Sequence, residues 1–209
     1  GYSDYERARA EARMADEAIK FIDKNKAKPF YVYLPHYGVH TPIMGKPEVI
    51  AKYQAKKAAG GHSNPVYAAL VESIDDSVGK LRAKLNELKL AENTIVIFTS
   101  DNGGLHVLEF PGTPATHCAP YRAGKGYLYE GGLREPFIVR WPKNLKGGKV
   151  IDTPISLLDV FPSLLTAAGL APNKVTGPLD GQSFLTLADE AQSPERTFYW
   201  HFPNYTNQG

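Results

Sequence analysis

The sequence predicts an α/β protein that contains part of a mainly parallel sheet flanked by helices. Apolar residues recur at helical spacing over residues 66–88, and this segment runs directly into the apolar run Ile95–Phe98. A helix that leads at once into a strand is typical of this fold class. A short strand without alternation is typical of a parallel sheet that is buried on both faces. The aromatic run Pro29–Leu34 predicts a second strand of the same kind.

The remaining elements follow from the same patterns. Apolar residues at helical spacing predict a first helix that ends near Asn25, and Ser3 and Glu6 have the spacing of a capping box at its start. We expect the charged side chains of this helix to face solvent, and we expect the same of Asp75 and Asp76 in the long helix. Further elements are expected as a short helix within 46–59, a strand at Phe137–Trp141, a helix over 155–168 that stops at Gly169, and a strand that opens at Thr197.

Polar side chains follow both predicted strands at their carboxyl ends. Asp101 and Asn102 come after one strand, and His40 comes after the other. In open α/β sheets, ligands bind beyond the carboxyl ends of the strands. Calcium and magnesium prefer carboxylate and amide oxygens, and histidine is suited to proton transfer near neutral pH. Each feature alone also fits a plainer role, because Asp-Asn-Gly-Gly is a common turn sequence and a single histidine often makes only structural hydrogen bonds.

A glycine-rich loop adds a cationic group to these polar residues. Gly124-Lys125-Gly126 places one ammonium group between two flexible residues, which suits close contact with an anion. The sequence therefore contains His-Thr-Pro, then Ser-Asp-Asn-Gly, then Arg-x-Gly-Lys-Gly, then Tyr-Glu-Gly-Gly-x-Arg-x-Pro. In their order and spacing these motifs resemble the sulfatase family, and the likeness extends over almost the whole chain.

The resemblance implies a role for each of these residues. It implies that Asp101 and Asn102 are ligands of calcium, with magnesium as the alternative cation. It also implies that His40 and Lys125 are catalytic residues that contact the sulfate group of the substrate. Arg122 is expected to support this loop or to bind the anion. The expected reaction is the hydrolysis of an aryl or carbohydrate sulfate ester by an arylsulfatase-like, metal-binding enzyme.

The resemblance further implies the alkaline-phosphatase-like sulfatase fold, truncated at both ends. Residues 1–195 are then the second part of the catalytic domain, and residues 196–209 open a smaller C-terminal region. The family's early aspartate ligands and its nucleophile lie before this part. We therefore expect a fragment that is inactive alone, from a protein that is periplasmic or secreted in its full length.

The single cysteine lies in a segment that matches the nucleophile motif of the same family. Sulfatases use a formylglycine made from the cysteine or serine of Cys-x-Pro-x-Arg, and the chain contains Cys118-Ala-Pro-Tyr-Arg122. The family's motif precedes the His-Thr-Pro segment, whereas this match follows Asp101. We therefore expect Cys118 to be an ordinary loop thiol. One cysteine also excludes an internal disulfide.

Composition and charge exclude several classes of protein. The 209 residues are 43% hydrophobic and 22% charged, which is ordinary for a soluble globular protein. The net charge of +2 is too small to indicate binding to nucleic acid. No apolar run approaches the ~18 residues of a membrane span. Two alternatives stay open: a metal-dependent phosphodiesterase or phosphonate hydrolase of the same superfamily, and a non-catalytic protein that binds sulfated glycans.

Overall fold

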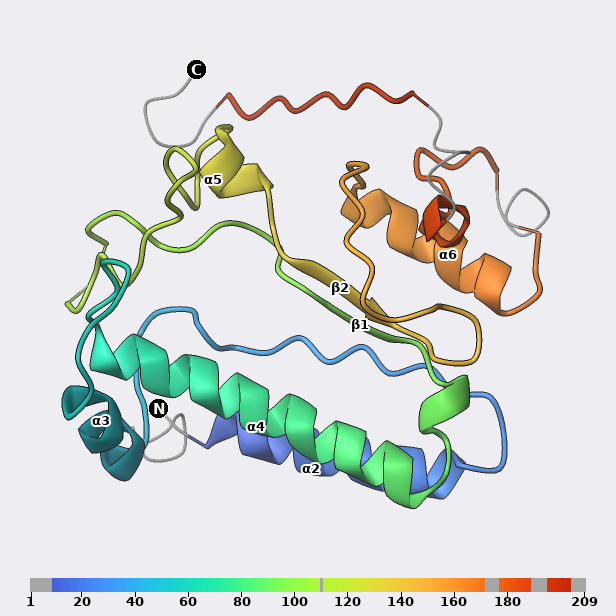
Figure 1. Cartoon of the computed structure of the whole chain (residues 1–209), viewed down its shortest axis with the longest axis horizontal. Coiled ribbons are helices and arrows are strands. Elements are labelled where there is room, and N and C mark those ends of the chain that lie inside the picture. The colour runs from blue at the N-terminus through green and yellow to red at the C-terminus, as the bar shows by residue number, and fades with distance from the viewer. Residues whose placement is uncertain (1–8, 110, 172–176, 189–194, 204–209) are drawn as a thin grey trace. The chain divides into compact units, whose positions relative to one another are not determined.

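A computed structural model describes residues 9–109, 111–171, 177–188 and 195–203 (Figure 1). The described chain forms two compact units. The first runs up to Lys143 and includes the segment from Trp200 onward, and the second is Asn144–Tyr199. The capping box expected at Ser3 and Glu6 lies outside the described residues. None of the described helices is long and apolar enough to span a lipid bilayer.

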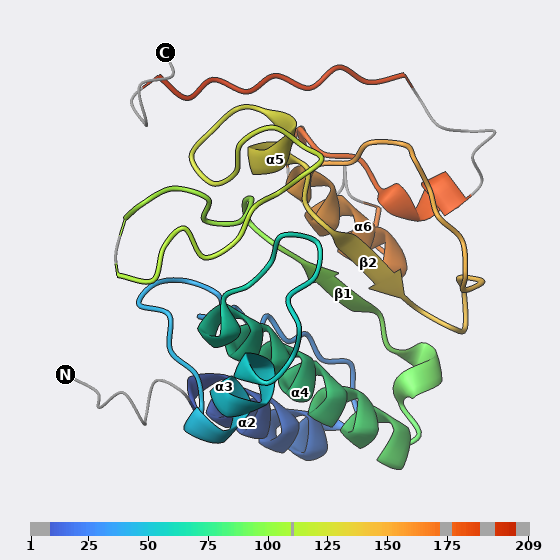
Figure 2. The same cartoon turned by 60° about the vertical axis from the view of Figure 1, so that its left-hand side comes forward.

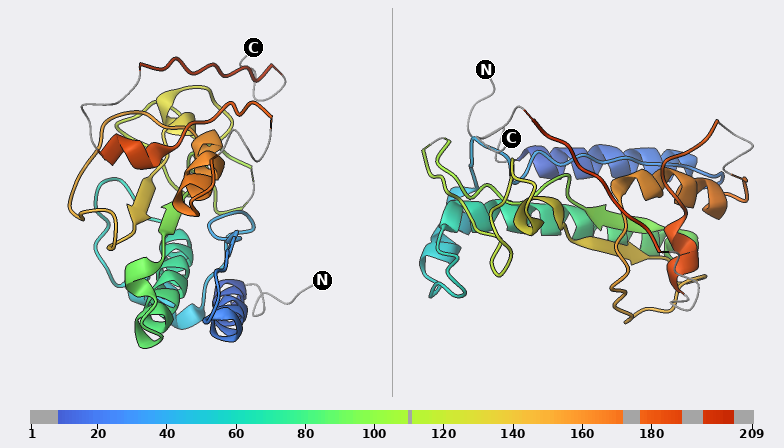
Figure 3. Two further views of the ribbon diagram at one scale, coloured as in Figure 1. Left: turned by 90° about the vertical axis from the view of Figure 1, so that its right-hand side faces the viewer. Right: turned by 90° about the horizontal axis from the view of Figure 1, so that it is seen from above.

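Three helices form one side of the first unit. They are α2 (Ala10–Asn25), α3 (Pro47–Gln54) and α4 (Pro65–Glu87). All three were predicted from the sequence, α2 and α4 from their apolar periodicity. The start of α4 is fixed by Asn64, whose side chain accepts hydrogen bonds from the backbone amides of Val66 and Tyr67, at 3.0 Å each. Helices α2 and α4 pack against each other, and α3 packs on α4. Figure 3 shows α2 and α4 running side by side.

The core of this unit lies between the helix pair and the segments that follow it. Ile22, Leu85 and Ala91 are buried there. Phe30, Val32 and Val96 are among the partly buried residues that pack against them. Burying a large apolar side chain stabilises a fold by about 1.5–3 kcal/mol, so this cluster fixes the segment at 30–34 against α2 and α4. In Figure 1 this segment runs between the helix pair and β1.

The sheet in the described residues has two strands, β1 (Val96–Thr99) and β2 (Phe137–Arg140). They are antiparallel, with Val96 opposite Arg140 and Thr99 opposite Phe137 (Figure 2). Both strands were predicted, but the expected parallel pairing is not found among the described residues. A wholly apolar run predicts burial on both faces, yet Phe98 and Ile138 are 37% and 59% exposed in the described structure. The direction of the neighbouring strand depends on a distant segment.

The run Pro29–Leu34 is extended but belongs to no sheet in the described part of the chain. Its side chains alternate, since Phe30 and Val32 pack inward while Tyr31 and Tyr33 are 66% and 76% exposed. The segment therefore has the geometry of a strand without a neighbouring strand to pair with there. The strand expected to open at Thr197 is likewise not assigned to any sheet over 197–203.

The second unit contains η2 (Leu157–Asp159), α6 (Val160–Ala167) and η3 (Phe184–Ala188). The predicted helix over 155–168 thus begins later than expected, because Ser156 and Asp159 form a capping box over a 3-10 turn. The helix ends before Gly169, whose φ of +75° confirms the predicted stop. Asp159 is fully buried and accepts two hydrogen bonds from Arg196, at 2.7 and 3.0 Å.

Candidate functional site

The structure brings His40 and Lys125 together, although 85 residues separate them in the sequence. Nζ of Lys125 lies 3.0 Å from Nε2 of His40. Nδ1 of His40 lies 2.8 Å from the backbone carbonyl oxygen of Thr41, which can only accept a hydrogen bond. Nδ1 therefore carries a hydrogen, and in the neutral ring Nε2 can accept from the Lys125 ammonium. This arrangement assigns the tautomer and leaves Nε2 as the exchangeable position of the ring.

Backbone hydrogen bonds tie the loop of Lys125 to the segment that carries Asp101 and Asn102. The backbone N–H of Lys125 donates to the carbonyl of Gly104 at 3.1 Å. The N–H of Gly103 donates to the carbonyl of Gly132, within α5 (Glu130–Leu133), at 3.2 Å. The two segments that the sequence singles out are thus one interlocked backbone structure, and the position of Lys125 depends on the turn after β1.

This interlocking requires glycine at position 103. A Cβ atom built there would overlap with the carbonyl oxygen of Gly131. A Cβ at Gly132 would likewise overlap with the carbonyl oxygen of Tyr127. Neither neighbour is a flexible side chain that could move aside, so the backbone of one loop must shift if either residue gains a methyl group.

We expect Gly103→Ala to destabilise the protein by about 3 kcal/mol, the upper end of the cost of overpacking. Gly79 in α4 is the matched control, because nothing lies within 4 Å of a Cβ built there. Gly79→Ala should leave stability unchanged or raise it by up to about 1 kcal/mol, as in other helix interiors. Denaturant unfolding measures both changes. Equal midpoints for the two variants would contradict the close approach of the two backbones.

Asp101 and Asn102 lie at the end of β1, as predicted from the sequence. Asp101 is exposed and Asn102 is half-buried. The backbone carbonyl of Asn102 accepts a hydrogen bond from Oγ of Ser100 at 3.0 Å, and its Nδ2 donates to the carbonyl of Gly103 at 3.0 Å. The side-chain amide is therefore oriented by its own backbone. Among the described residues, no group of three or more His, Cys, Asp or Glu side chains has the arrangement of a metal site.

Glu135 adds a second carboxyl group near Asp101, which sequence reasoning did not identify. Its Oε1 is buried without a hydrogen-bond partner. Burial, and then the charge of Asp101, raise the pKa of Glu135 to about 6. The sequence around Glu135, between Arg134 and Pro136, did not indicate that its side chain is buried. That burial depends on the segments that fold around it. Two carboxyl groups therefore lie near the end of β1.

Arg122 stacks on an aromatic ring. Its guanidinium carbon lies 3.8 Å from the centroid of the Tyr129 ring, a cation–π contact. Its backbone carbonyl accepts the N–H of Gly131 at 2.9 Å. The predicted support of the loop is consistent with these two contacts, and a stacked guanidinium keeps the N–H groups at its edge available for an anion.

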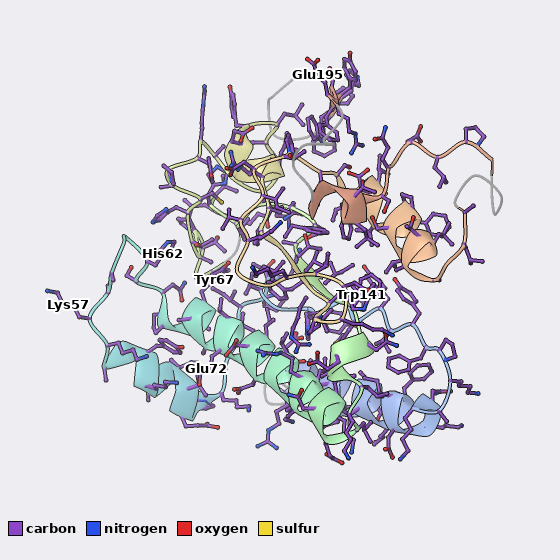
Figure 4. All side chains as sticks on the ribbon, turned by 45° about the vertical axis from the view of Figure 1, so that its right-hand side comes forward. Lys57, His62, Tyr67, Glu72, Trp141 and Glu195 are labelled. Carbon is purple, nitrogen blue, oxygen red and sulfur yellow. The ribbon has the colours of Figure 1, made fainter. Side chains whose placement is uncertain are left out.

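Histidines of two further loops meet beside the start of α4. The rings of His62 and His117 stack with centroids 4.1 Å apart, and Nδ1 of His62 lies 3.3 Å from Oγ1 of Thr116. Figure 4 shows His62 on the loop that precedes α4 and Tyr67 on its first turn. His106 is a separate case, because its Nδ1 is buried without a hydrogen-bond partner and burial lowers its pKa. The stacked rings therefore link the loop before α4 to the loop that carries Thr116 and His117.

Comparison with known proteins identifies the family. A family model described as Sulfatase matches residues 3–170. The chain belongs to the sulfatase family. The family that the motifs indicated is therefore confirmed, whereas the roles of the individual residues stay predictions.

Sulfatases of animals and bacteria are similar to this chain. Steryl-sulfatase of Mus musculus is 38% identical over 199 residues, which are 92% of this chain and 30% of the relative. A sulfatase of Formosa agariphila is 36% identical over 208 residues, or 92% of this chain and 36% of the relative. The crystal structure of Ps i-CgsB in complex with k-i-k-neocarrahexaose aligns with a TM-score of 0.74 and 34% identity, over 85% of this chain and 38% of that one.

This sulfatase chain spans about a third of the length of the curated relatives that it matches. The similarity to solved sulfatases confirms the fold family, although the described sheet is antiparallel. The cysteine of the sulfatase chain, Cys118, is half-buried, and its Sγ lies 4.0 Å from the carbonyl oxygen of Gly104. Its thiol thus makes a weak contact with the interlocked loops that position Lys125.

Proposed function

We propose that this chain forms part of an enzyme that hydrolyses aryl or carbohydrate sulfate esters, with His40 and Lys125 at the reacting group. The observation that supports this best is the 3.0 Å contact between Nε2 of His40 and Nζ of Lys125. The contact joins two motifs of the sulfatase family that lie far apart in the chain. Membership of the family supports the class of reaction.

In this proposal Lys125 binds the sulfate group. Its side chain is half-buried and its ammonium group lies beside the exposed ring of His40, so an anion from solvent can reach it. The backbone bond from Lys125 to Gly104 fixes the base of the side chain. A cation held in place before the reaction stabilises the negative charge that grows on the sulfate oxygens as the ester bond breaks.

His40 carries the proton. Because its Nδ1–H is bound to the carbonyl of Thr41, Nε2 is the atom that takes up and releases a proton. When the S–O bond to the alcohol breaks, the departing oxygen needs a proton. Nε2 supplies it from the doubly protonated ring, and the ring takes up its second proton from solvent before each turnover. We place the nucleophile, a formylglycine in this family, outside this chain, since Cys118 follows the β1 segment and contacts Gly104 instead. On this proposal the chain alone is inactive.

The donors at the end of β1 fit a hard divalent cation. Asp101 offers a carboxylate and Asn102 an amide oxygen. Oε1 of Glu135 is buried without a hydrogen-bond partner, and the Glu135 carboxyl is close enough to Asp101 to interact with its charge. Oxygen donors of this kind suit calcium or magnesium. Calcium takes about 6–8 oxygens, so we propose that these residues supply only part of its ligands. A bound cation would neutralise charge on the sulfate oxygens.

We expect calcium to raise the melting temperature of the protein and expect Asp101→Asn to remove most of this rise. A ligand present at about 100 times its Kd stabilises the folded state by about 2.7 kcal/mol. Asp75→Asn, at an exposed position in α4, is the matched control and should keep the full rise. Thermal unfolding with calcium and with a chelator measures the effect. An undiminished rise in Asp101→Asn would remove Asp101 from the cation site.

The proposed reaction is tested on the full-length protein with nitrophenyl sulfate and bis(nitrophenyl) phosphate. Faster hydrolysis of the sulfate ester is the expected result. Faster hydrolysis of the phosphate diester would instead assign the protein to the phosphoesterases of the same superfamily. Binding of a sulfated glycan without turnover of either compound would show that the protein is not a catalyst.

A further inference from the structure

Glu11 is a buried carboxylate that the proposed reaction does not use. It lies in the first turn of α2 and is only 3% exposed. Charged side chains are almost never buried to this extent unless they are paired. Glu11 shares a helical face with the buried residues Ala15, Ala18 and Ile22, so a carboxylate stands where the helical pattern calls for an apolar side chain.

Both oxygens of Glu11 bind the segment that leads to His40. Oε1 accepts a hydrogen bond from the backbone N–H of Gly38 at 2.7 Å. Oε2 pairs with Nδ1 of His36, whose side chain is 14% exposed. A Cβ built on Gly38 would lie 3.2 Å from Cδ1 of Ile74 in α4. The backbone of Gly38 is therefore enclosed between the two helices, with the carboxylate of Glu11 on one side.

The segment bound by Glu11 continues directly into the contact with Lys125. The backbone N–H of His40 donates to the carbonyl of Tyr37 at 2.9 Å, which closes a turn over residues 37–40. Glu11 contacts the residue before this turn and a residue within it. From that turn, Nδ1 of His40 reaches the carbonyl of Thr41 and Nε2 reaches Lys125. A displacement of the turn would therefore displace the imidazole.

Stability alone is a weak reason for such a group. A buried ion pair often contributes no more than well-packed apolar side chains of the same volume, because removing both groups from water costs as much as their attraction returns. An apolar residue at position 11 would continue the face of Ala15 and Ala18 equally well. The two contacts instead determine the position of one particular turn.

We propose that Glu11 is a positioning residue for His40: its carboxylate fixes His36 and Gly38, and through them the turn that presents the imidazole to Lys125. The effect on catalysis rests on the proposed function of His40. The effect on the imidazole itself does not, and it can be measured without any substrate.

Three variants of the full-length protein separate positioning from folding. Glu11→Met fills the buried space while removing both contacts. Glu11→Gln keeps an oxygen that can accept from Gly38 and so tests rescue. Glu17→Met is the control on the same helix, because Glu17 is exposed and pairs with Lys20 at 2.6 Å. If Glu11→Met fails to fold, His36→Asn takes its place, because it removes the imidazole that pairs with Glu11.

The first measurement is long-range proton–nitrogen NMR of the His40 ring, assigned with His40→Asn. We expect a single Nδ1–H tautomer in the wild type, in Glu11→Gln and in Glu17→Met, and a mixture of tautomers in Glu11→Met. A folded Glu11→Met with the wild-type His40 signals would overturn the proposal.

The second measurement is the hydrolysis of nitrophenyl sulfate. Glu11→Met should lower kcat about 10–100-fold, as expected for a catalytic group displaced by about 1 Å, with KM within about threefold. Glu11→Gln should stay within about fivefold of the wild type. If the wild type hydrolyses no sulfate ester, the proposed function fails, and the His40 signals still decide whether Glu11 positions the ring.

Discussion

Replacing Lys125 by alanine should lower kcat/KM for a sulfate ester by about 10²–10³-fold. The loss of one fixed group that stabilises developing negative charge typically has this effect on catalysis. The ammonium lies 3.0 Å from His40 in the folded protein, so the site needs no rearrangement to present it. The variant should keep its stability, because Lys125 is held through its backbone N–H, which alanine also has.

The matched control is Lys57→Ala. Lys57 is exposed on the loop after α3, and Figure 4 shows its side chain extending away from the rest of the chain. Initial rates of the full-length protein with nitrophenyl sulfate measure both variants. A Lys125→Ala enzyme with more than about a tenth of wild-type activity would show that this ammonium is not at the reacting group.

Asp159→Asn should destabilise the second unit by about 3–5 kcal/mol, the usual cost of breaking a buried ion pair by removing one partner. Asp159 accepts from the backbone amides of Ser156 at 2.9 Å and Gln182 at 2.8 Å and is bound by both terminal nitrogens of Arg196. Asparagine has nearly the same volume, but it leaves the guanidinium without a counter-charge and replaces one acceptor with a donor.

The same group gives a pH dependence with a definite sign. Burial alone would raise the pKa of Asp159, but the hydrogen bonds from Arg196 and from the amides of Ser156 and Gln182 outweigh burial, and the pKa lies below its ordinary value. The unfolded chain binds a proton near pH 3.9. The stability contributed by Asp159 is therefore complete above about pH 4 and is lost as the pH falls through the folded pKa.

Denaturant unfolding between pH 3 and pH 7 measures both effects, with limited proteolysis to locate opening within residues 144–199. Asp152→Asn is the control, because Asp152 is exposed. We expect the difference between Asp159→Asn and the wild type to be largest at neutral pH and to shrink toward pH 3. A difference that stayed constant over this range would mean that the cost comes from packing and not from charge.

The helices could be predicted from the sequence because their signals are local. The apolar spacing over residues 66–88 predicted α4 to within one residue at either end. The stop at Gly169 was equally local. It was predicted from the glycine alone, and its φ of +75° confirms it. Elements of this kind depend on residues within about one helical turn of each other.

The sheet could be predicted only in part. The apolar runs located β1 and β2, but their antiparallel pairing joins residues some forty positions apart. Strand direction depends on that pairing, and the unbroken apolar run Ile95–Phe98, which is typical of a parallel sheet, gave the wrong direction for the described pair. The extended segment at Pro29–Leu34 shows the same limit, because its alternating exposure describes which face is covered and says nothing about which strand lies beside it.

The residues of the candidate site that lie in family motifs could be predicted from the sequence. Those that reach the site only through the fold could not. His40 and Lys125 were linked only through the likeness to a family, and the structure brings them into contact. Glu11 was expected to face solvent with the other charges of its helix. Its spacing from Ala15, Ala18 and Ile22 was the signal that it is buried, since a carboxylate on an apolar face needs a partner.

The overlap that a methyl group would create at Gly103 and Gly132 has an evolutionary consequence. These residues are required by two backbones that pass within contact distance of each other, whatever reaction takes place nearby. A descendant that had lost its chemistry would still need them in order to fold. The glycines of these motifs therefore indicate a shared fold and common descent. Evidence of a working enzyme must come from the side chains between them.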